Sequence, residues 1–314
     1  MAHEVETMFY TSNEENQRFV PWHGLGTPVA EALTSEEALV QAGLDWTVES
    51  KPVFTESGIA IPGYRANTRS TDDKVLGIVS SRYKVVQNSE AFQFTDELIS
   101  GDVRYETAGS LRGGKSVWLL AKMPDTKILG DDVAPYICFS NSHDGLGSVR
   151  VCMTPVRVVC NNTLNIALDT AHRSWSAKHI GNITDKLDEA RRTLELAHDY
   201  MVALDTKADE LANTTVTDDQ LEQITSVIFA PPVDATDRVK KNATDLKEKF
   251  MVCYFAPDLL RFRNTAWGVV NAASDFATHV RSGQSKGKFN ESNWANVING
   301  NPFIDAIASA VSKV

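Results

Sequence analysis

Residues 109–116, GSLRGGKS, match the P-loop pattern of a glycine, four variable residues and Gly-Lys-Ser. In a P-loop this stretch follows a strand and opens a helix, so that backbone N–H groups at the start of the helix surround a phosphate. Here the residues that follow, Val117 to Pro124, are short, apolar and end in proline, which is typical of a strand. We therefore expect Arg112-Gly113-Gly114 to be the turn of a β-hairpin, with nucleotide binding at Gly109–Ser116 as the alternative.

The histidines and cysteines lack the spacing of a metal site or of a catalytic pair. The sequence has no HxxxH, HExxH or CxxC motif, which would place two ligands on one face of an element. Cys138, Cys152, Cys160 and Cys253 are not spaced like a disulfide framework. We expect no metal, no cofactor and no catalytic centre, and we expect the cysteines to pack as small apolar residues.

Two arginines, Arg150 and Arg157, interrupt the otherwise apolar stretch from Tyr136 to Leu168. Side chains alternate between the two faces of a strand, so arginines seven positions apart would point in opposite directions. Pro155 cannot donate a hydrogen bond within a central ladder, which predicts a bulge at Thr154–Pro155. One extra residue there would bring both arginines to the same face.

We expect a cationic groove on that face. Proteins that bind single-stranded nucleic acid combine basic side chains, which contact phosphates, with aromatic rings on which bases stack. The candidate nucleic-acid-binding residues are Arg150, Arg157, Arg112, Lys115, Arg82 and Lys84, with Tyr83 as the stacking residue. The alternative is a solvated sheet face whose charges pair with one another, such as Arg104 with Glu106.

Charge is unevenly distributed along the 314 residues, whose formal net charge is −10. Residues 1–50 contain nine acidic residues and one basic residue, whereas residues 51–180 contain fifteen basic and thirteen acidic residues. The total argues against a simple nucleic-acid-binding protein, but the middle of the chain permits a local basic surface. No apolar run approaches the roughly 20 residues of a membrane span, and the acidic N-terminus is unlike a secretory signal, so we expect a cytoplasmic protein.

Strand patterns fill most of residues 46–160, with one helix predicted at 34–42 and another at 88–100. The stretch from Tyr136 to Leu168 is predicted to be the central hairpin of the sheet, running directly into a helix. Beyond residue 181 only helical patterns occur. This order predicts an α+β fold, with an antiparallel β-rich domain at 1–180 and a helical region at 181–314 that forms its own domain or packs on the same core.

Leu187, Leu194, Met201 and Ala208 recur every seven residues in the helical region. This spacing predicts one helix of roughly 28 residues with a coiled-coil-like seam. We expect the seam, together with open sheet edges, to mediate homo-oligomerisation.

Several longer motifs resemble those of one known family. They are Pro21–Gly26 (PWHGLG), Glu106–Gly114 (ETAGSLRGG), Ser140–Gly145 (SNSHDG) and Thr154–Leu164 (TPVRVVCNNTL). Through them nearly the whole chain resembles the phage/plasmid-like family known as domain of unknown function 932. The resemblance implies a mobile-element origin, and hence the cytoplasm of a bacterial host, but no particular activity.

The order of elements is also similar to the core of Rad52-like and RecT-like single-strand annealing proteins. In that core a strand, a helix and at least three antiparallel strands with basic residues precede another helix, and a resemblance of this kind concerns the fold alone. It implies single-stranded DNA in a basic groove and assembly into rings or filaments.

We therefore expect a single-stranded DNA binding or annealing protein of a phage or mobile element, acting in recombination or replication without a catalytic centre. The second hypothesis is a phage assembly or host-interaction protein that binds protein partners and no nucleic acid, which the heptad helix favours. The third is a P-loop nucleotide hydrolase using Gly109–Ser116.

Overall fold

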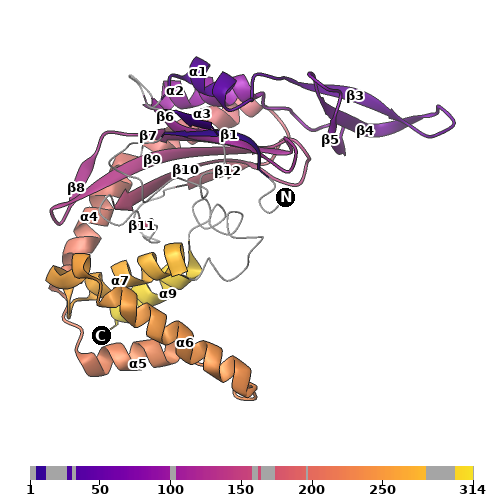
Figure 1. The fold of residues 1–314 in the computed structure, drawn as a ribbon. Helices are drawn as coiled ribbons and strands as arrows, with labels where there is room; N and C mark the ends of the chain where they lie inside the picture. Colours follow the sequence, from indigo (N-terminus) through magenta and orange to yellow (C-terminus); the bar gives the residue numbers. More distant parts are fainter. Residues whose placement is uncertain are drawn as a thin grey trace.

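The computed structural model describes residues 5–11, 27–29, 33–99, 104–157, 162–163, 174–195, 197–280 and 301–313. Strands dominate the N-terminal half and helices make up the C-terminal half, which confirms the α+β class (Figure 1). None of the helices in these ranges is long and apolar enough to cross a membrane.

A large sheet forms the N-terminal half. Its order is β11-β10-β9-β7-β6-β1-β2, with β12 beside β10 and β8 beside β9. Its neighbouring strands are antiparallel except for β1 and β2, which are parallel. Its strands are β1 (Val5–Thr11), β2 (Thr27–Val29), β6 (Arg104–Leu111), β7 (Ser116–Lys122), β8 (Thr126–Ile128), β9 (Asp131–Ser142), β10 (Val149–Arg157), β11 (Asn162–Thr163) and β12 (Ser174–Ala177).

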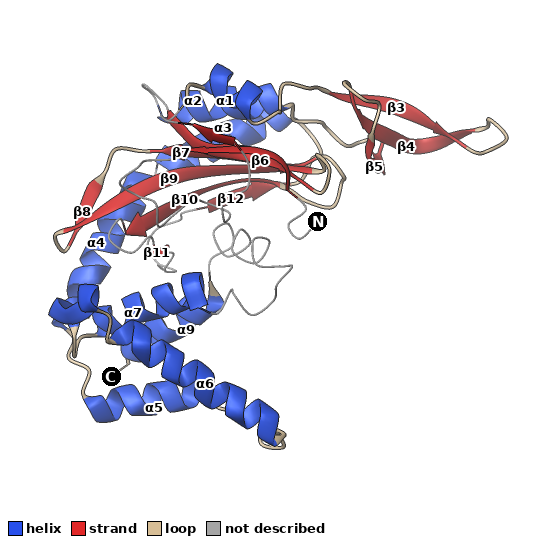
Figure 2. Ribbon diagram, in the orientation of Figure 1, coloured by secondary structure: helices blue, strands red, loops and turns tan. Residues whose placement is uncertain are grey.

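Three helices cover one face of this sheet (Figure 2). They are α1 (Ser35–Gln41), α2 (Asn88–Ile99) and α3 (Ile183–Glu195). Aromatic side chains of α2 provide the contact, because the Phe94 ring lies 5.9 Å from Phe139 and the Phe92 ring 4.9 Å from Tyr105. These aromatic rings are buried, and burial of large apolar side chains stabilises the packing of helix on sheet.

The P-loop pattern lies on a β-hairpin, as expected from the residues that follow it. Strand β6 ends at Leu111, Arg112 and Gly113 adopt positive φ angles of 54° and 70°, and β7 begins at Ser116. All of residues 104–122 are described, and no helix follows the glycine turn. The arrangement of N–H groups that cradles phosphate in a P-loop is therefore not formed here.

The bulge expected at Thr154–Pro155 is not present. Strands β9 and β10 pair residue for residue from Arg150 with Ser140 to Arg157 with Val133. Pro155 lies opposite Pro135, and an antiparallel ladder contains positions at which facing residues exchange no hydrogen bonds. Two opposed prolines fit such a position, so the ladder continues without an extra residue. Positions 150 and 157 consequently belong to opposite faces of the sheet, and the prediction that they share one face is wrong.

Strands β3 (Val48–Phe54), β4 (Ala60–Arg69) and β5 (Val75–Ser80) form a separate three-stranded sheet, which we call the arm. The arm projects away from the main sheet (Figure 1). At its base, the Arg69 guanidinium donates to both carboxylate oxygens of Glu6 on β1, at 2.9 and 3.0 Å. This bidentate pair ties the arm to the main sheet.

The helical half packs around a cluster of aromatic rings from Phe229, Phe250, Phe276 and Phe303, whose centroids lie between 5.4 and 6.4 Å apart. Its elements are α4 (Ala197–Asn213), α5 (Asp218–Ile228), α6 (Asp237–Tyr254), η3 (Pro257–Phe262), α7 (Ala266–Asp275), η4 (Phe276–Val280) and α9 (Pro302–Val311). Buried apolar residues of both halves belong to one contiguous cluster. The division of the chain into domains near residue 181 stays a prediction.

The heptad pattern corresponds to two helices, α3 and α4, on either side of residue 196, which lies outside the described residues. Along this seam Ala190, Leu204, Ala208 and Leu211 are almost completely buried within the chain itself. These positions are therefore not available to a second copy.

The helix predicted after Cys160 falls mostly on residues that the structure does not describe. The two described residues there, Asn162 and Thr163, form β11, which pairs with β10.

Candidate functional site

Five of the seven candidate residues meet at the loop between β9 and β10. Two of them lie on the β6–β7 hairpin. The carbonyl oxygen of Lys115 accepts a hydrogen bond from the His143 N–H at 2.8 Å. The Arg112 guanidinium lies 3.5 Å from the Asp144 carboxylate and donates to the Ser116 hydroxyl.

The segment after β5 supplies the other three. The Tyr83 hydroxyl donates to the carbonyl of Ser142, and the Tyr83 ring stacks on His179 with centroids 4.4 Å apart. The Lys84 N–H donates to the His179 carbonyl at 2.8 Å, and the His179 ring donates back to the Lys84 carbonyl at 2.9 Å. Arg82 is exposed beside Tyr83. One ring face of Tyr83 is thus already occupied within the protein.

We define the rim as residues 80–86, 112–116, 142–150 and 178–182, which meet at the end of the sheet beside the arm. The rim contains six basic residues and one acidic residue. The basic residues are Arg82, Lys84, Arg112, Lys115, Arg150 and Lys178, and the acidic one is Asp144. In a chain with a net charge of −10, this local excess creates a positive surface to which anions are attracted.

Arg150 reaches the rim from β10. It pairs with Ser140 on β9 and with Ser176 on β12, so it lies two residues along the ladder from Ser142. Arg157 lies seven residues further along the strand, about 23 Å away at 3.3 Å per residue. The structure brings Arg150 to the predicted site and places Arg157 at the opposite end of the sheet.

The interior of the loop is closed by its own side chains. The Ser142 hydroxyl donates to the Asp144 carboxylate at 2.5 Å and accepts the Gly147 N–H at 3.2 Å. The same carboxylate oxygen of Asp144 accepts the Leu146 N–H at 2.9 Å. Ser142 is therefore engaged in shaping the turn, and its geometry is that of a structural hydroxyl rather than of a nucleophile beside a base.

His143 is fully buried beneath this loop. The amide nitrogen of Asn88 donates to the Leu44 carbonyl at 3.0 Å, which orients the amide oxygen toward the ring nitrogen Nε2 of His143 at 3.1 Å. The Asn67 amide donates to the His143 carbonyl at 2.8 Å. His143 thus joins the arm, α2 and the loop into one network.

Burial decides the charge of the site's titratable groups. Desolvation, together with the neighbouring His179, lowers the pKa of His143 to about 3. Burial also lowers the pKa of His179, and burial raises the pKa of Tyr83 above its ordinary value. Both imidazoles are therefore neutral at physiological pH, and the positive charge of the rim comes from its lysines and arginines.

Two glycines allow the loop to approach the arm. A Cβ on Gly77 of β5 would lie 2.5 Å from the Asp144 Cα, and a Cβ on Gly145 would lie 2.9 Å from the Val79 side chain. Gly145 also has a φ of 78°, which favours glycine. Direct contact between arm and loop therefore requires both residues to lack a side chain.

The structure adds residues that the sequence patterns did not indicate. Lys178 becomes part of the rim because β12 pairs with β10, and the nearby Lys186 ammonium donates to the carbonyls of Lys178 and Ile180. The pairing of β10 with β12, some twenty residues apart, leaves no periodicity in the sequence from which it could be predicted. The described ranges hold no group of three or more His, Cys, Asp or Glu residues placed to bind a metal ion.

Comparison with known proteins gives one match. The family model described as Domain of unknown function (DUF932) matches residues 75–295. That range includes every candidate residue and all residues of the rim. No curated protein and no solved structure matches the chain.

Proposed function

The chain belongs to the DUF932 family, whose description names no activity, and we propose that it binds single-stranded DNA along the rim. One observation carries this proposal: six basic residues and one acidic residue meet at the rim of a strongly acidic protein. Phosphate contacts of this kind supply most of the affinity of non-specific nucleic-acid binding.

The exposure of the basic groups supports the proposal. Arg82, Lys84 and Lys178 are exposed, and 40% of the Arg112 side chain is accessible although it lies near Asp144. Basic side chains that remain in water can exchange their counterions for phosphates, which is the source of the affinity.

The finer form of the proposal is strand annealing by a phage or mobile-element protein in the bacterial cytoplasm. Its support is the order of elements, which resembles that of Rad52-like and RecT-like annealing proteins. This finer form would add pairing of two complementary strands to the binding of one strand.

A gel-shift titration with a labelled single strand at several salt concentrations tests binding. For single strands the slope of log K against log salt is about −0.7 per phosphate contact. Replacing Arg82 and Lys84 together by alanine should reduce the magnitude of that slope by roughly 1.4 and weaken binding roughly tenfold at 0.1 M salt.

Lys127→Ala is the matched control, because Lys127 lies on β8 at the other end of the same sheet, paired with Asp132. It should leave the slope and the affinity unchanged. The absence of any shift with the natural chain at micromolar protein and low salt would contradict the proposal. So would equal losses in the double variant and in the control.

A further inference from the structure

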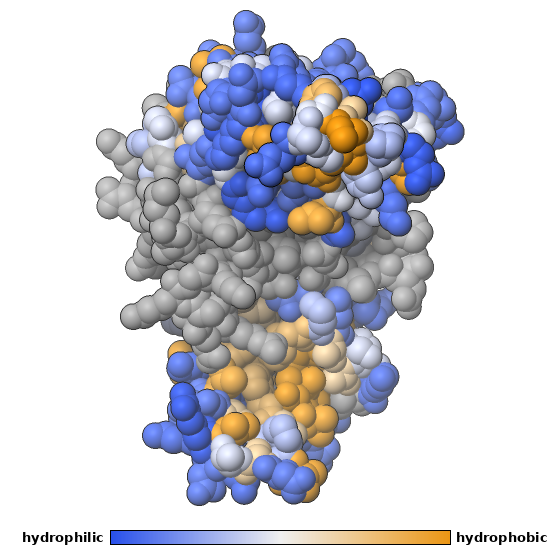
Figure 3. Space-filling view, turned by 90° about the vertical axis from the view of Figure 1, so that its right-hand side faces the viewer, coloured by the Kyte–Doolittle hydropathy of each residue, from blue (hydrophilic) through white to orange (hydrophobic). Residues whose placement is uncertain are grey.

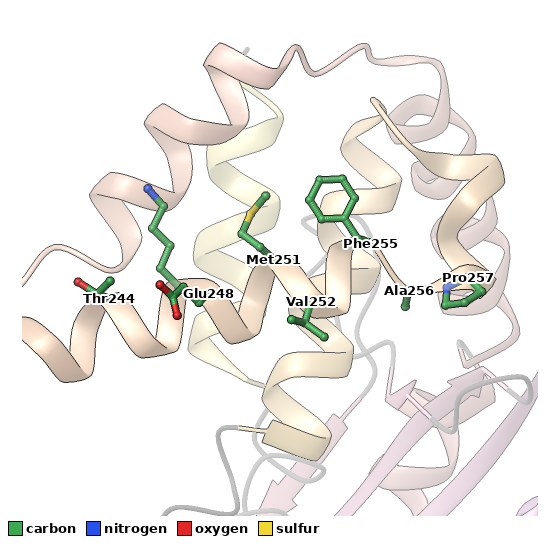
Figure 4. A pocket seen from close by; sticks show the side chains of 8 residues that line it. Thr244, Glu248, Met251, Val252, Phe255, Ala256 and Pro257 are labelled. Carbon is green, nitrogen blue, oxygen red and sulfur yellow. The ribbon is translucent and has the colours of Figure 1, made fainter.

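Apolar side chains reach the surface in both halves of the molecule (Figure 3), and charge distinguishes the places where they lie. The arm, residues 48–80, carries six of them together with four basic and four acidic residues. In the helical half, an apolar groove of about 770 Å³ on α6 is lined by both Lys247 and Glu248 (Figure 4). At the rim, two exposed apolar residues, Leu146 and Ile180, lie among six basic residues and one acidic residue. Such a surface fits a ligand that is anionic and also has apolar faces.

Leu146 lies in the β9–β10 loop and is 85% exposed. The Asp144 carboxylate accepts its backbone N–H at 2.9 Å, and the Ser142 hydroxyl accepts the N–H of Gly147 at 3.2 Å. A Cβ on Gly147 would lie 2.6 Å from the Ser142 Cβ, so the loop closes tightly on itself. These contacts hold the backbone on both sides of Leu146. The loop therefore presents this side chain to solvent in an ordered form, which lowers the entropic cost of binding a ligand.

Ile180, which is 45% exposed, belongs to the same network. The Lys186 ammonium donates to its carbonyl, and the neighbouring His179 ring stacks on Tyr83. Tyr83 in turn donates to the carbonyl of Ser142, where the loop begins. Both apolar side chains thus stand on backbone that is held within the rim.

The charge that Leu146 shares its surface with is positive. Asp144, the acidic residue of the rim, has a side chain that is only 4% exposed, and the Arg112 guanidinium lies 3.5 Å from it. The Arg112 side chain remains accessible to water. An anion that approaches the loop therefore meets a guanidinium rather than a carboxylate.

Single-stranded nucleic acid combines the two required properties, because its phosphates are anionic and the faces of its unpaired bases are apolar and accessible. In a duplex the bases are stacked on one another, and a protein side chain does not reach their faces. An anionic membrane is another ligand with both properties. Attachment to a membrane scales with the apolar area inserted, however, and two aliphatic side chains offer little.

We propose that Leu146 inserts between neighbouring bases of a single strand bound along the rim, with Ile180 as a second apolar contact. Apolar side chains such as leucine enter between base steps and unstack them. The inference rests on the proposed function and adds to it the feature by which the rim distinguishes unpaired from paired strands.

Leu146→Ser separates this base contact from the phosphate contacts. We expect its affinity for a single strand to fall roughly fivefold, the lower end of what one base contact contributes. The slope of log K against log salt should not change, because no phosphate contact is removed. Affinity for a duplex of the same sequence should be equal in both chains. The fluorescence of 2-aminopurine placed at several positions of the strand, which rises when a base is unstacked, should increase with the natural chain and not with the variant.

Two further variants serve as controls. Leu146→Phe should match or exceed the natural affinity, because an aromatic ring stacks on bases. Val233→Ser changes an exposed apolar side chain between α5 and α6, outside the rim, and should leave affinity and fluorescence unchanged. All of these side chains are exposed, so each variant should keep the natural melting temperature.

The outcomes separate this inference from the proposed function. Equal single-strand affinity of the natural and Leu146→Ser chains would overturn the inference and leave the proposed function standing, as would binding of the natural chain without a change in fluorescence. If Leu146→Ser bound DNA normally but no longer bound vesicles of anionic phospholipid, the inference would be overturned in favour of a membrane surface. A natural chain that binds no single strand would overturn both.

Discussion

The inside and the outside of the rim differ in almost every physical respect. Inside, His143, Asp144 and Asn88 are buried and each makes a defined hydrogen bond. Outside, Arg82 and Lys84 extend into water. The motif SNSHDG, which attracts attention in the sequence, thus builds the loop, whereas the proposed ligand contacts fall to unremarkable lysines and arginines around it.

Among substitutions that test this contrast, Gly77→Ala should have the largest effect on stability. The new Cβ would lie 2.5 Å from the Asp144 Cα, and neither backbone can move without separating the arm from the loop. We expect the free energy of unfolding to fall by about 3 kcal/mol, measured by urea denaturation. Gly58→Ala is the control, since its Cβ meets nothing within 4 Å and only its φ of 78° is unfavourable, which costs about 1 kcal/mol. Equal effects of the two substitutions would refute the close-contact explanation.

The next effect concerns pH. Because burial lowers the pKa of His143 to about 3 from an ordinary value of 6.5, the unfolded chain binds this proton more readily than the folded chain. The contribution of His143 to the free energy of unfolding is therefore fully present above pH 6.5 and is lost as the pH decreases toward 3. This contribution falls by about 2 kcal/mol between pH 7 and pH 5.

Melting curves of the natural chain and of His143→Gln over this range provide the measurement. The variant should be less stable at pH 7 but should lose less stability on acidification. The contribution of His179, whose pKa burial also lowers, remains in both chains. An unchanged pH dependence in the variant would contradict the assignment.

The smallest expected effect is that of Lys84→Ala on stability. The backbone N–H and carbonyl of Lys84 hold His179, and alanine retains both groups. We expect the free energy of unfolding to stay within about 0.5 kcal/mol of the natural value, measured by the same urea titration. A loss comparable to that of Gly77→Ala would show that the outer surface of the rim is structural after all.

Local signals in the sequence predicted the helix ends well. The helix predicted at 34–42 is α1 (Ser35–Gln41), and the helix predicted at 88–100 is α2 (Asn88–Ile99). The prediction of a β-hairpin turn between β6 and β7 was also correct. The apolar run from Val117 ends in Pro124, which is unfavourable within a helix.

Long-range pairing was not predictable in the same way. Strand β1 pairs with β6 about a hundred residues away, and no periodicity in either segment identifies its partner. The bulge at Pro155 was wrong because the deciding residue, Pro135, lies on another strand. The structure brings six of the seven candidate residues to the rim, from the β6–β7 turn, the segment after β5 and the start of β10, whereas the predicted position of Arg157 depended on the bulge.

The facing prolines also fix the alignment of the β9–β10 hairpin during folding. If one strand slipped by a single residue, its proline would occupy a position that needs an N–H donor, and every side chain of that strand would change faces. The correct alignment is thus selected about 20 Å from the loop, at the far end of the ladder. The register set by Pro135 and Pro155 thus determines that residues Ser142 to Gly147 form the turn.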